Sequence, residues 1–216
     1  MTQPGRISDA VAEYREAIRI QPAYPEAHFS IASALAHSGL KEDQPEALRE
    51  YQTAIRLKPD YVEAHYNLAN LLSQMPGRSP EAISEYRKVL RLEPDLAEAH
   101  ANLGNAFAQV PDGLPDAIQE YETALRIKPS LTMQRINLAN ALSQTPGRLP
   151  DAIRQYEAVL DAEPGFAEGH FLLARALAAI PGRIPEAIGE CESALRLDPR
   201  FEPAHELLEL LRAGRK

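Results

Sequence analysis

The 216-residue chain carries 23 Lys and Arg against 31 Asp and Glu, a formal net charge of −8. This acidity argues against nucleic acid and against an anionic membrane surface as partners, because both are bound mainly through Lys and Arg. The N-terminus lacks the apolar core of a signal peptide, and no stretch is long and apolar enough to span a bilayer, so we expect a cytoplasmic protein.

A repeat of 35 residues runs through the chain, and three columns of residues keep its step. The proline column, whose first step is 37, consists of Pro22, Pro59, Pro94, Pro129, Pro164 and Pro199. The tyrosine column consists of Tyr14, Tyr51, Tyr86, Tyr121, Tyr156 and, in the last repeat, Cys191. The alanine column consists of Ala10, Ala47, Ala82, Ala117, Ala152 and Ala187. Because the columns stay in phase, we expect one domain over residues 1–216.

Each repeat reads as two short amphipathic helices. In residues 62–74 apolar side chains recur at helical spacing, with Asp60 expected as the N-cap and Pro76-Gly77 as the stop. Residues 81–92 form the second helix, which carries Ala82 and Tyr86 on its apolar face. Neither helix could bury its apolar face alone, so successive hairpins must stack.

In chain order, the pattern first predicts an unpaired helix over 7–21, equivalent to the second helix of a repeat. Five helical hairpins follow over 24–200. A last helix over 201–213, equivalent to the first helix of a repeat, is expected to cap the stack. Each hairpin places a small residue in its first helix where two helix axes approach, as at Ala69, Gly104, Ala139 and Ala174. We therefore expect an all-α protein of about twelve antiparallel helices.

These columns resemble the tetratricopeptide repeat (TPR) family, through Leu68-Ala69, Ala82, Tyr86 and Pro94 and their equivalents across the whole chain. The resemblance implies a right-handed α-α superhelix, a TPR solenoid, whose first helices line a concave face. Two departures are the step of 35, where 34 is usual, and histidine in place of a large aromatic residue. The added residue falls in a Pro-Gly-Arg-x-Pro turn, seen at 76–80, 146–150 and 181–185.

The exposed stripe of the first helices predicts a peptide-binding groove. Its residues lie three or four apart and share one helix face. They are Tyr66, Asn67, Asn70, Gln74, Asn102, Asn105, Gln109, Asn137, Asn140 and Gln144. An asparagine amide both donates and accepts, so a ladder of them could pair with an extended peptide backbone. The ladder is similar to that in the TPR arm of O-linked N-acetylglucosamine transferase, although asparagine is also common in these columns throughout the family.

The charged residues on the same stripe indicate which charge the bound peptide should carry. Glu63, Glu98 and Glu168 stand where a clamp for acidic chaperone tails would need Lys or Arg, and Arg175 is the only base. We therefore expect a neutral or basic peptide in preference to an acidic tail.

Five histidines, His28, His65, His100, His170 and His205, share one column, and the spacing of packed helices places them too far apart for a metal site. We expect them to be packing residues whose protonation near pH 6 costs stability. Arg135 interrupts the column and follows Met133-Gln134, so the fourth hairpin is the least typical. Cys191, in the tyrosine column, is expected in the core.

No pattern predicts a catalytic centre, a metal site or a cofactor, so the chain is expected not to be an enzyme. The favoured interpretation is a protein-interaction module that binds an extended peptide or a partner protein. One alternative is the targeting arm of a larger enzyme such as a glycosyltransferase. Another is head-to-tail self-association through the N-terminal helix, whose Ala10, Tyr14 and Ala17 have no upstream helix to cover them.

Overall fold

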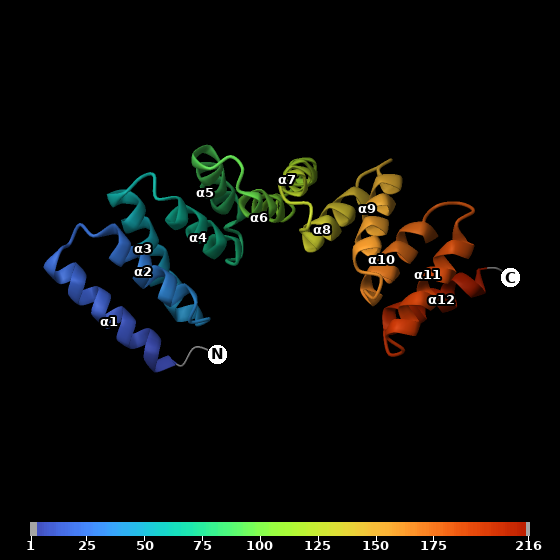
Figure 1. The fold of residues 1–216 in the computed structure, drawn as a ribbon, viewed down its shortest axis with the longest axis horizontal. Coiled ribbons are helices and arrows are strands. Elements are labelled where there is room, and N and C mark those ends of the chain that lie inside the picture. The colour runs from blue at the N-terminus through green and yellow to red at the C-terminus, as the bar shows by residue number, and fades with distance from the viewer. Residues whose placement is uncertain (1–3, 215–216) are drawn as a thin grey trace. The chain divides into compact units, whose positions relative to one another are not determined.

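The computed structural model describes residues 4–214, which contain twelve α-helices, one short 3-10 helix and no strand (Figure 1). This confirms the all-α class. The chain divides into two compact units, Met1–Gly113 and Leu114–Lys216. Among the described residues, no helix has the length and apolar character needed to cross a membrane.

The first unit alternates two kinds of helix. Its elements are α1 (Pro4–Ile20), α2 (Pro25–Ala36), the 3-10 helix η1 (Lys41–Asp43), α3 (Gln44–Leu57), α4 (Val62–Ser73), α5 (Ser79–Leu92) and α6 (Ala97–Phe107). Helix α2 pairs with α3, and α4 pairs with α5. Each second helix also contacts the next first helix, and α4 contacts both α2 and α6. The first helices thus form one layer of this unit.

The second unit repeats the scheme. Its helices are α7 (Leu114–Ile127), α8 (Thr132–Ser143), α9 (Leu149–Ala162), α10 (Ala167–Ala178), α11 (Ile184–Leu197) and α12 (Glu202–Ala213). Helices α8 and α9 form one hairpin, α10 and α11 another, and α12 packs on α11 and α10. Four predicted hairpins therefore lie within a unit. The predicted pairing of α6 with α7 spans the two units, and that hairpin and the single domain stay predictions.

The core of each hairpin is built on the tyrosine column. Tyr51, Tyr86 and Tyr156 are each about 1% exposed, and Cys191 is fully buried. The small residue of the first helix, such as Ala69 or Ala139, is also fully buried, because a larger side chain there would separate the packed helices.

The two ends of the repeat differ from its middle. Tyr14 in α1 is 38% exposed, in contrast with its buried equivalents. In α12, Glu209 is exposed and the Arg212 guanidinium lies 2.7 Å from Glu192 of α11. Self-association through α1 stays a prediction.

The Pro-Gly-Arg-x-Pro motif forms a tight turn between the helices of a hairpin. Gly77, Gly147 and Gly182 have φ of +76°, +78° and +85°, a left-handed conformation that glycine adopts without a steric cost. The N–H of the following arginine donates to the carbonyl three residues earlier, as from Arg78 to Met75. Proline and glycine in the second and third places are typical of a type II turn.

The arginine of this turn pairs with an acid in the first turn of the second helix. The pairs are Arg78–Glu81, Arg148–Asp151 and Arg183–Glu186. An acid at a helix N-terminus also interacts favourably with the helix dipole.

The first helices begin differently from the prediction at Asp60. The N-cap of α4 is Tyr61, and its side chain makes no capping hydrogen bond. The N–H groups of Ala64 and His65 donate instead to the Tyr61 carbonyl. The prediction was wrong because Pro59 and Asp60 belong to the preceding turn, and the buried aromatic ring of Tyr61 fixes the helix entry.

The histidine column links each hairpin to the one before it. His65 Nε2 lies 3.0 Å from the carbonyl oxygen of Pro59, and its Nδ1 lies 2.6 Å from Glu85 Oε2. His28 contacts Pro22 and Glu50 in the same way, and His170 contacts Pro164 and Glu190. Each of these rings thus places its two nitrogens against two oxygen atoms, a proline carbonyl and a glutamate carboxylate.

Arg135 occupies the same place in its own hairpin, with a guanidinium instead of an imidazole. Its guanidinium donates to the carbonyl of Pro129 at 3.1 Å and to Gln155 Oε1 at 3.0 Å. Arginine and glutamine therefore occupy the places of histidine and glutamate. The expectation that protonation of the histidine rings weakens the fold stays a prediction.

We expect His65→Ala to lower the free energy of unfolding by about 1–3 kcal/mol, because it leaves the half-buried Glu85 short of a donor. The double variant His65→Arg/Glu85→Gln reproduces the Arg135–Gln155 pair and is expected to recover most of that loss. Urea denaturation of the three proteins measures the difference. Equal stability of the single and double variants would contradict the shared role of these residues.

A second prediction concerns acid. Burial raises the pKa of Glu85, but hydrogen bonds from His65 and Lys88 outweigh it and leave this pKa below its ordinary value. A carboxyl whose pKa is lower in the folded state stabilises the fold above its unfolded pKa, and the contribution is lost as pH falls. Between about pH 5 and pH 3, thermal melts of Glu85→Gln should therefore lose less stability than those of the parent. An equal loss of stability in the parent and in Glu85→Gln over this pH range would contradict the stabilising role of the Glu85 carboxylate.

Candidate functional site

The predicted groove residues lie on the first helices of both units. Helix α4 carries Tyr66, Asn67 and Asn70, with Gln74 as its C-cap, and α6 carries Asn102 and Asn105, followed by Gln109. Of the remaining three, Asn137 and Asn140 lie in α8 of the second unit, and Gln144 is its C-cap. The structure therefore brings together the seven residues of the first unit, and the other three form a separate set.

A cavity of about 470 Å³ marks the groove in the first unit. Its lining includes six of the predicted residues, Asn67, Asn70, Gln74, Asn102, Asn105 and Gln109. It also includes His37 of the α2 C-cap and the buried rings of Tyr51 and Tyr86, which sequence reasoning assigned to the core alone. The floor of this cavity thus includes two core tyrosines, although each is about 1% exposed.

A hydrogen-bond network connects α4, α5 and α6 at this floor. The Tyr86 hydroxyl donates to Asn70 Oδ1 at 2.5 Å. Asn102 Nδ2 donates to the same oxygen at 3.0 Å and to the Tyr66 hydroxyl at 3.0 Å. Asn70 and Asn102 therefore stabilise the packing of neighbouring hairpins as well as facing the groove.

The same bond recurs in other hairpins. In the second unit the Tyr156 hydroxyl donates to Asn140 Oδ1 at 2.6 Å, and in the first unit the Tyr51 hydroxyl donates to Ser33 Oγ at 3.1 Å. A buried hydroxyl without a partner would cost stability, so this column needs a short polar side chain. This requirement supplies a structural reason for asparagine at positions 70 and 140, apart from any ligand.

The tyrosine hydroxyls of the floor remain protonated donors. Burial raises the pKa of Tyr86 well above its ordinary value, and burial also raises that of Tyr66, where Asn70 opposes the rise and Glu98 adds to it. Each phenol can therefore donate one hydrogen bond throughout the neutral range.

Asn70 and Asn102 line the cavity and also take part in this network. Asn70 Oδ1 accepts from Tyr86 and from Asn102, and Asn102 Nδ2 also donates to the Tyr66 hydroxyl. A side-chain amide has both an acceptor oxygen and N–H donors, so each asparagine has more hydrogen-bonding groups than the bonds named here use.

A second cavity of about 460 Å³ adjoins the first and shares Ser73, Gln74 and Gln109 with it. Its other walls are mainly apolar and come from the two turns at this edge: Met75, Pro76, Pro80, Val110 and Pro111. Sequence reasoning missed this cavity. The signal that could have found it is Ser79, a small polar residue in a mainly aliphatic column.

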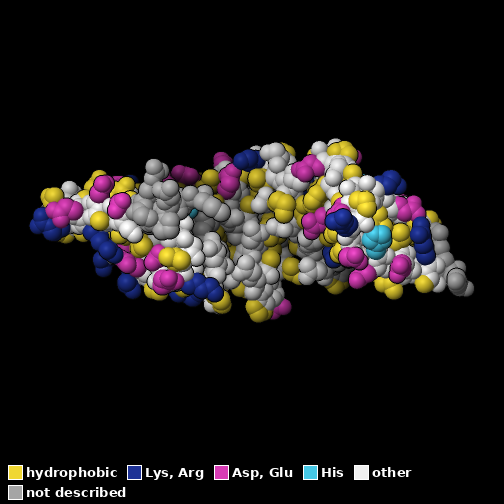
Figure 2. Space-filling model, turned by 90° about the horizontal axis from the view of Figure 1, so that it is seen from below, with side chains coloured by type: hydrophobic (Ala, Val, Ile, Leu, Met, Phe, Trp, Pro, Cys, Tyr) yellow, Lys and Arg dark blue, Asp and Glu magenta, His cyan; other side chains and the backbone are white. Residues whose placement is uncertain are grey.

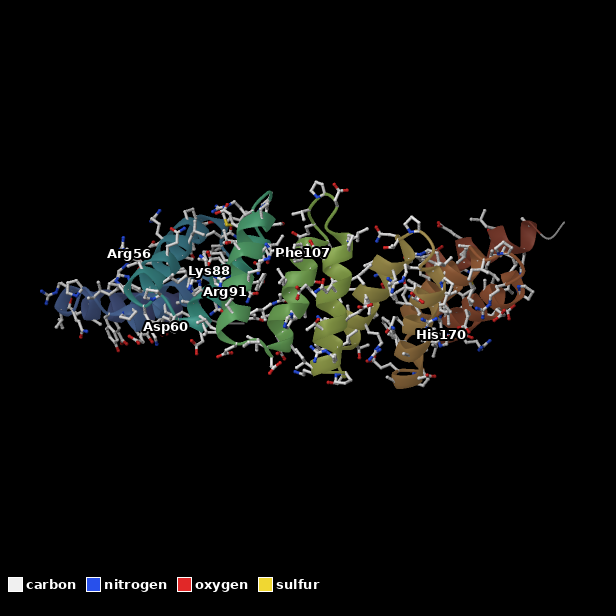
Figure 3. The ribbon with its side chains drawn as sticks, turned by 90° about the horizontal axis from the view of Figure 1, so that it is seen from above. Arg56, Asp60, Lys88, Arg91, Phe107 and His170 are labelled. Carbon is white, nitrogen blue, oxygen red and sulfur yellow. The ribbon has the colours of Figure 1, made fainter. Side chains whose placement is uncertain are left out.

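A third cavity, of about 320 Å³, lies on the His65 side of α4. Lys88 and Arg91 of α5 line it and lie on the same stretch of that helix (Figure 3). Lys88 also forms an ion pair within the hairpin, with its Nζ 2.6 Å from Glu85 Oε1.

Charge is dispersed on the face seen in Figure 2, where acidic and basic side chains are interspersed. In residues 4–214, no three His, Cys, Asp or Glu side chains gather in a way that could hold a metal ion. Burial raises the pKa of the Cys191 thiol to about 11, so the reactive thiolate is scarce at neutral pH.

Tyr86→Phe is expected to lower the free energy of unfolding by about 0.5–1.5 kcal/mol, because it removes the donor to Asn70 without changing the packed ring. In a double-mutant cycle with Asn70→Ala the two losses should not add, since they remove one bond. Tyr156→Phe with Asn140→Ala repeats the measurement in the second unit. Additive losses in urea denaturation would contradict the bond.

Comparison with known proteins identifies the repeat. A family profile described as "TPR repeat" matches residues 2–39, 40–75 and 77–110, and one described as "Tetratricopeptide repeat" matches residues 145–200. The unmatched residues 111–144 include Met133, Gln134 and Arg135 of the least typical hairpin. No curated protein sequence matches the chain.

Solved structures share the fold at low identity. YrrB, described as a TPR protein with an unusual peptide-binding site, is 20% identical with a TM-score of 0.76, over 89% of this chain and 96% of YrrB. MamA from Desulfovibrio magneticus RS-1 is 22% identical with a TM-score of 0.64, over 71% and 85%. PilF of Pseudomonas aeruginosa is 20% identical with a TM-score of 0.71, over 94% and 89%. These similarities concern the fold, and the family profiles, which match more than half of the chain, show that it belongs to the tetratricopeptide repeat family.

Proposed function

We propose that the protein binds an extended peptide, or an extended segment of a partner protein, in the groove formed by α2, α4 and α6. The repeat family serves generally as a scaffold for protein interactions. The observation that carries the proposal is the cavity of about 470 Å³ lined by the amides of the asparagine ladder. Its volume lies in the range typical of ligand sites.

The arrangement of donors and acceptors supports a peptide backbone as ligand. The Asn70 donors can pair with a peptide carbonyl, and the Asn102 acceptor with a peptide N–H. Hydrogen bonds to the peptide backbone do not depend on the sequence of the peptide. Selectivity among peptides therefore has to come from charge and from cavities that take peptide side chains.

Charge at the groove supports a neutral or basic ligand. Glu63 and Glu98 lie in the first turns of α4 and α6, and Glu98 is close enough to the groove to raise the pKa of Tyr66. An acidic peptide would be repelled there, while a Lys or Arg could pair with these carboxylates. The similar fold of YrrB, with its peptide-binding site, gives the proposal a precedent.

A display selection of random extended peptides on the full chain tests the proposal, with Asn67→Ala/Asn102→Ala as the groove variant. We expect selected peptides to bind the parent at least about tenfold more tightly than the variant, because two or more hydrogen bonds of about 0.5–1.5 kcal/mol are lost. Gln52→Ala/Ser84→Ala is the matched control, since both residues line a different depression on α3 and α5.

Thermal melts of both variants establish that they are folded. Absence of any enriched peptide, or equal binding by the folded groove variant, would contradict the proposed groove. The asparagines would then serve only to stabilise the stack.

A further inference from the structure

We infer that the second cavity is a specificity pocket that takes one aliphatic side chain of the bound peptide. The inference rests on the proposed function, because the pocket adjoins the groove and shares three of its residues. It assigns the ligand a chemistry: an extended, neutral or basic segment with a residue such as Leu, Ile or Met at one position.

The first step of the argument is the residue at position 79. The same column of the repeat contains Ile7, Leu114, Leu149 and Ile184, with Gln44 in the first hairpin. Ser79 is shorter than all of them and stands at the start of α5, beside the second cavity. This hairpin therefore lacks an aliphatic side chain at a position where most of its equivalents have one.

The second step is what the aliphatic residue does elsewhere. Ile184 of α11 packs against the core cluster that contains Ala174 of α10 and Leu208 of α12. It thus helps to fill the space between one hairpin and the next first helix. By the repeat, the corresponding space beside Ser79 lies between the α4–α5 hairpin and α6, and the cavity of about 460 Å³ lies there.

The third step is that the pocket has fixed walls. Ser79 Oγ donates to Gln109 Oε1 at 2.7 Å, which ties the start of α5 to the segment after α6. Pro76, Pro80 and Pro111 restrict the backbone of the two turns. Met75 is the adaptable wall, since its unbranched side chain adjusts to different apolar shapes. A preformed apolar site next to polar groups is typical of peptide recognition, in which pockets supply specificity.

Continuity with the groove identifies the occupant. Gln74 and Gln109 line both cavities, so a backbone held by the asparagine ladder passes the mouth of the pocket. A side chain leaving that backbone can enter between the prolines. No Lys, Arg, Asp or Glu lines the pocket, so burying an aliphatic group there desolvates no charge.

The test compares Ser79→Leu with Ser79→Ala in the full 216-residue chain. Ser79→Leu restores the aliphatic residue of the other hairpins and fills the pocket, while Ser79→Ala keeps it open and removes only the hydrogen bond to Gln109. Peptides selected on the parent are measured with the anchor residue intact and with that residue changed to Ala. Thermal melts verify that both variants are folded.

In the parent and in Ser79→Ala, we expect the anchor change to weaken binding at least about tenfold, and in Ser79→Leu by less than about threefold. Selected peptides without a recurring aliphatic position, or an undiminished anchor effect in Ser79→Leu, would overturn the pocket and leave the groove standing. Failure of the parent to bind any peptide would overturn the groove, and the pocket with it.

Discussion

The stack depends on satisfying the hydroxyl of a buried tyrosine. A ring such as Tyr86 fills the space between neighbouring hairpins, and it brings its polar atom to the end of the core. That atom must find a partner, and the nearest helix that can supply one is the first helix of the same hairpin. Asn70 and Asn140 meet this need, and in doing so they become part of the exposed layer. Core packing thus determines which polar groups the groove presents.

The histidine column applies the same principle on the other side of the first helix. His65 bonds to the last turn of the preceding hairpin and to the second helix of its own, so three segments meet at one ring. The Arg135–Gln155 pair makes the same two contacts with different chemistry. What recurs at these positions is therefore a side chain whose nitrogens contact both the preceding proline carbonyl and the second helix. The stack is held laterally by such polar contacts and by the apolar core between them.

Much of this could be predicted from the sequence, because the helices, the turns and the buried columns follow from periodicity. The tight turns followed from Pro-Gly, and the tyrosine and small-residue columns from their phase. The bonds of Asn70 and the double contact of His65 could not be predicted, because they depend on side chains that lie 16 and 20 residues away. The pocket beside Ser79 was missed for a related reason. Serine there is unusual only by comparison with the aliphatic residues at the equivalent positions of the other repeats.

The tyrosine column has a further consequence for how the protein can be observed. The chain has eight tyrosines and no tryptophan, so tyrosine emission is not masked by transfer to an indole. Tyr86 and Tyr156 are buried and hydrogen-bonded to an amide oxygen, whereas Tyr14 is partly in solvent. Each hairpin with a tyrosine therefore carries an optical reporter of its own. Replacing all but one of them with phenylalanine would allow the opening of a single hairpin to be followed by its fluorescence, without any added label.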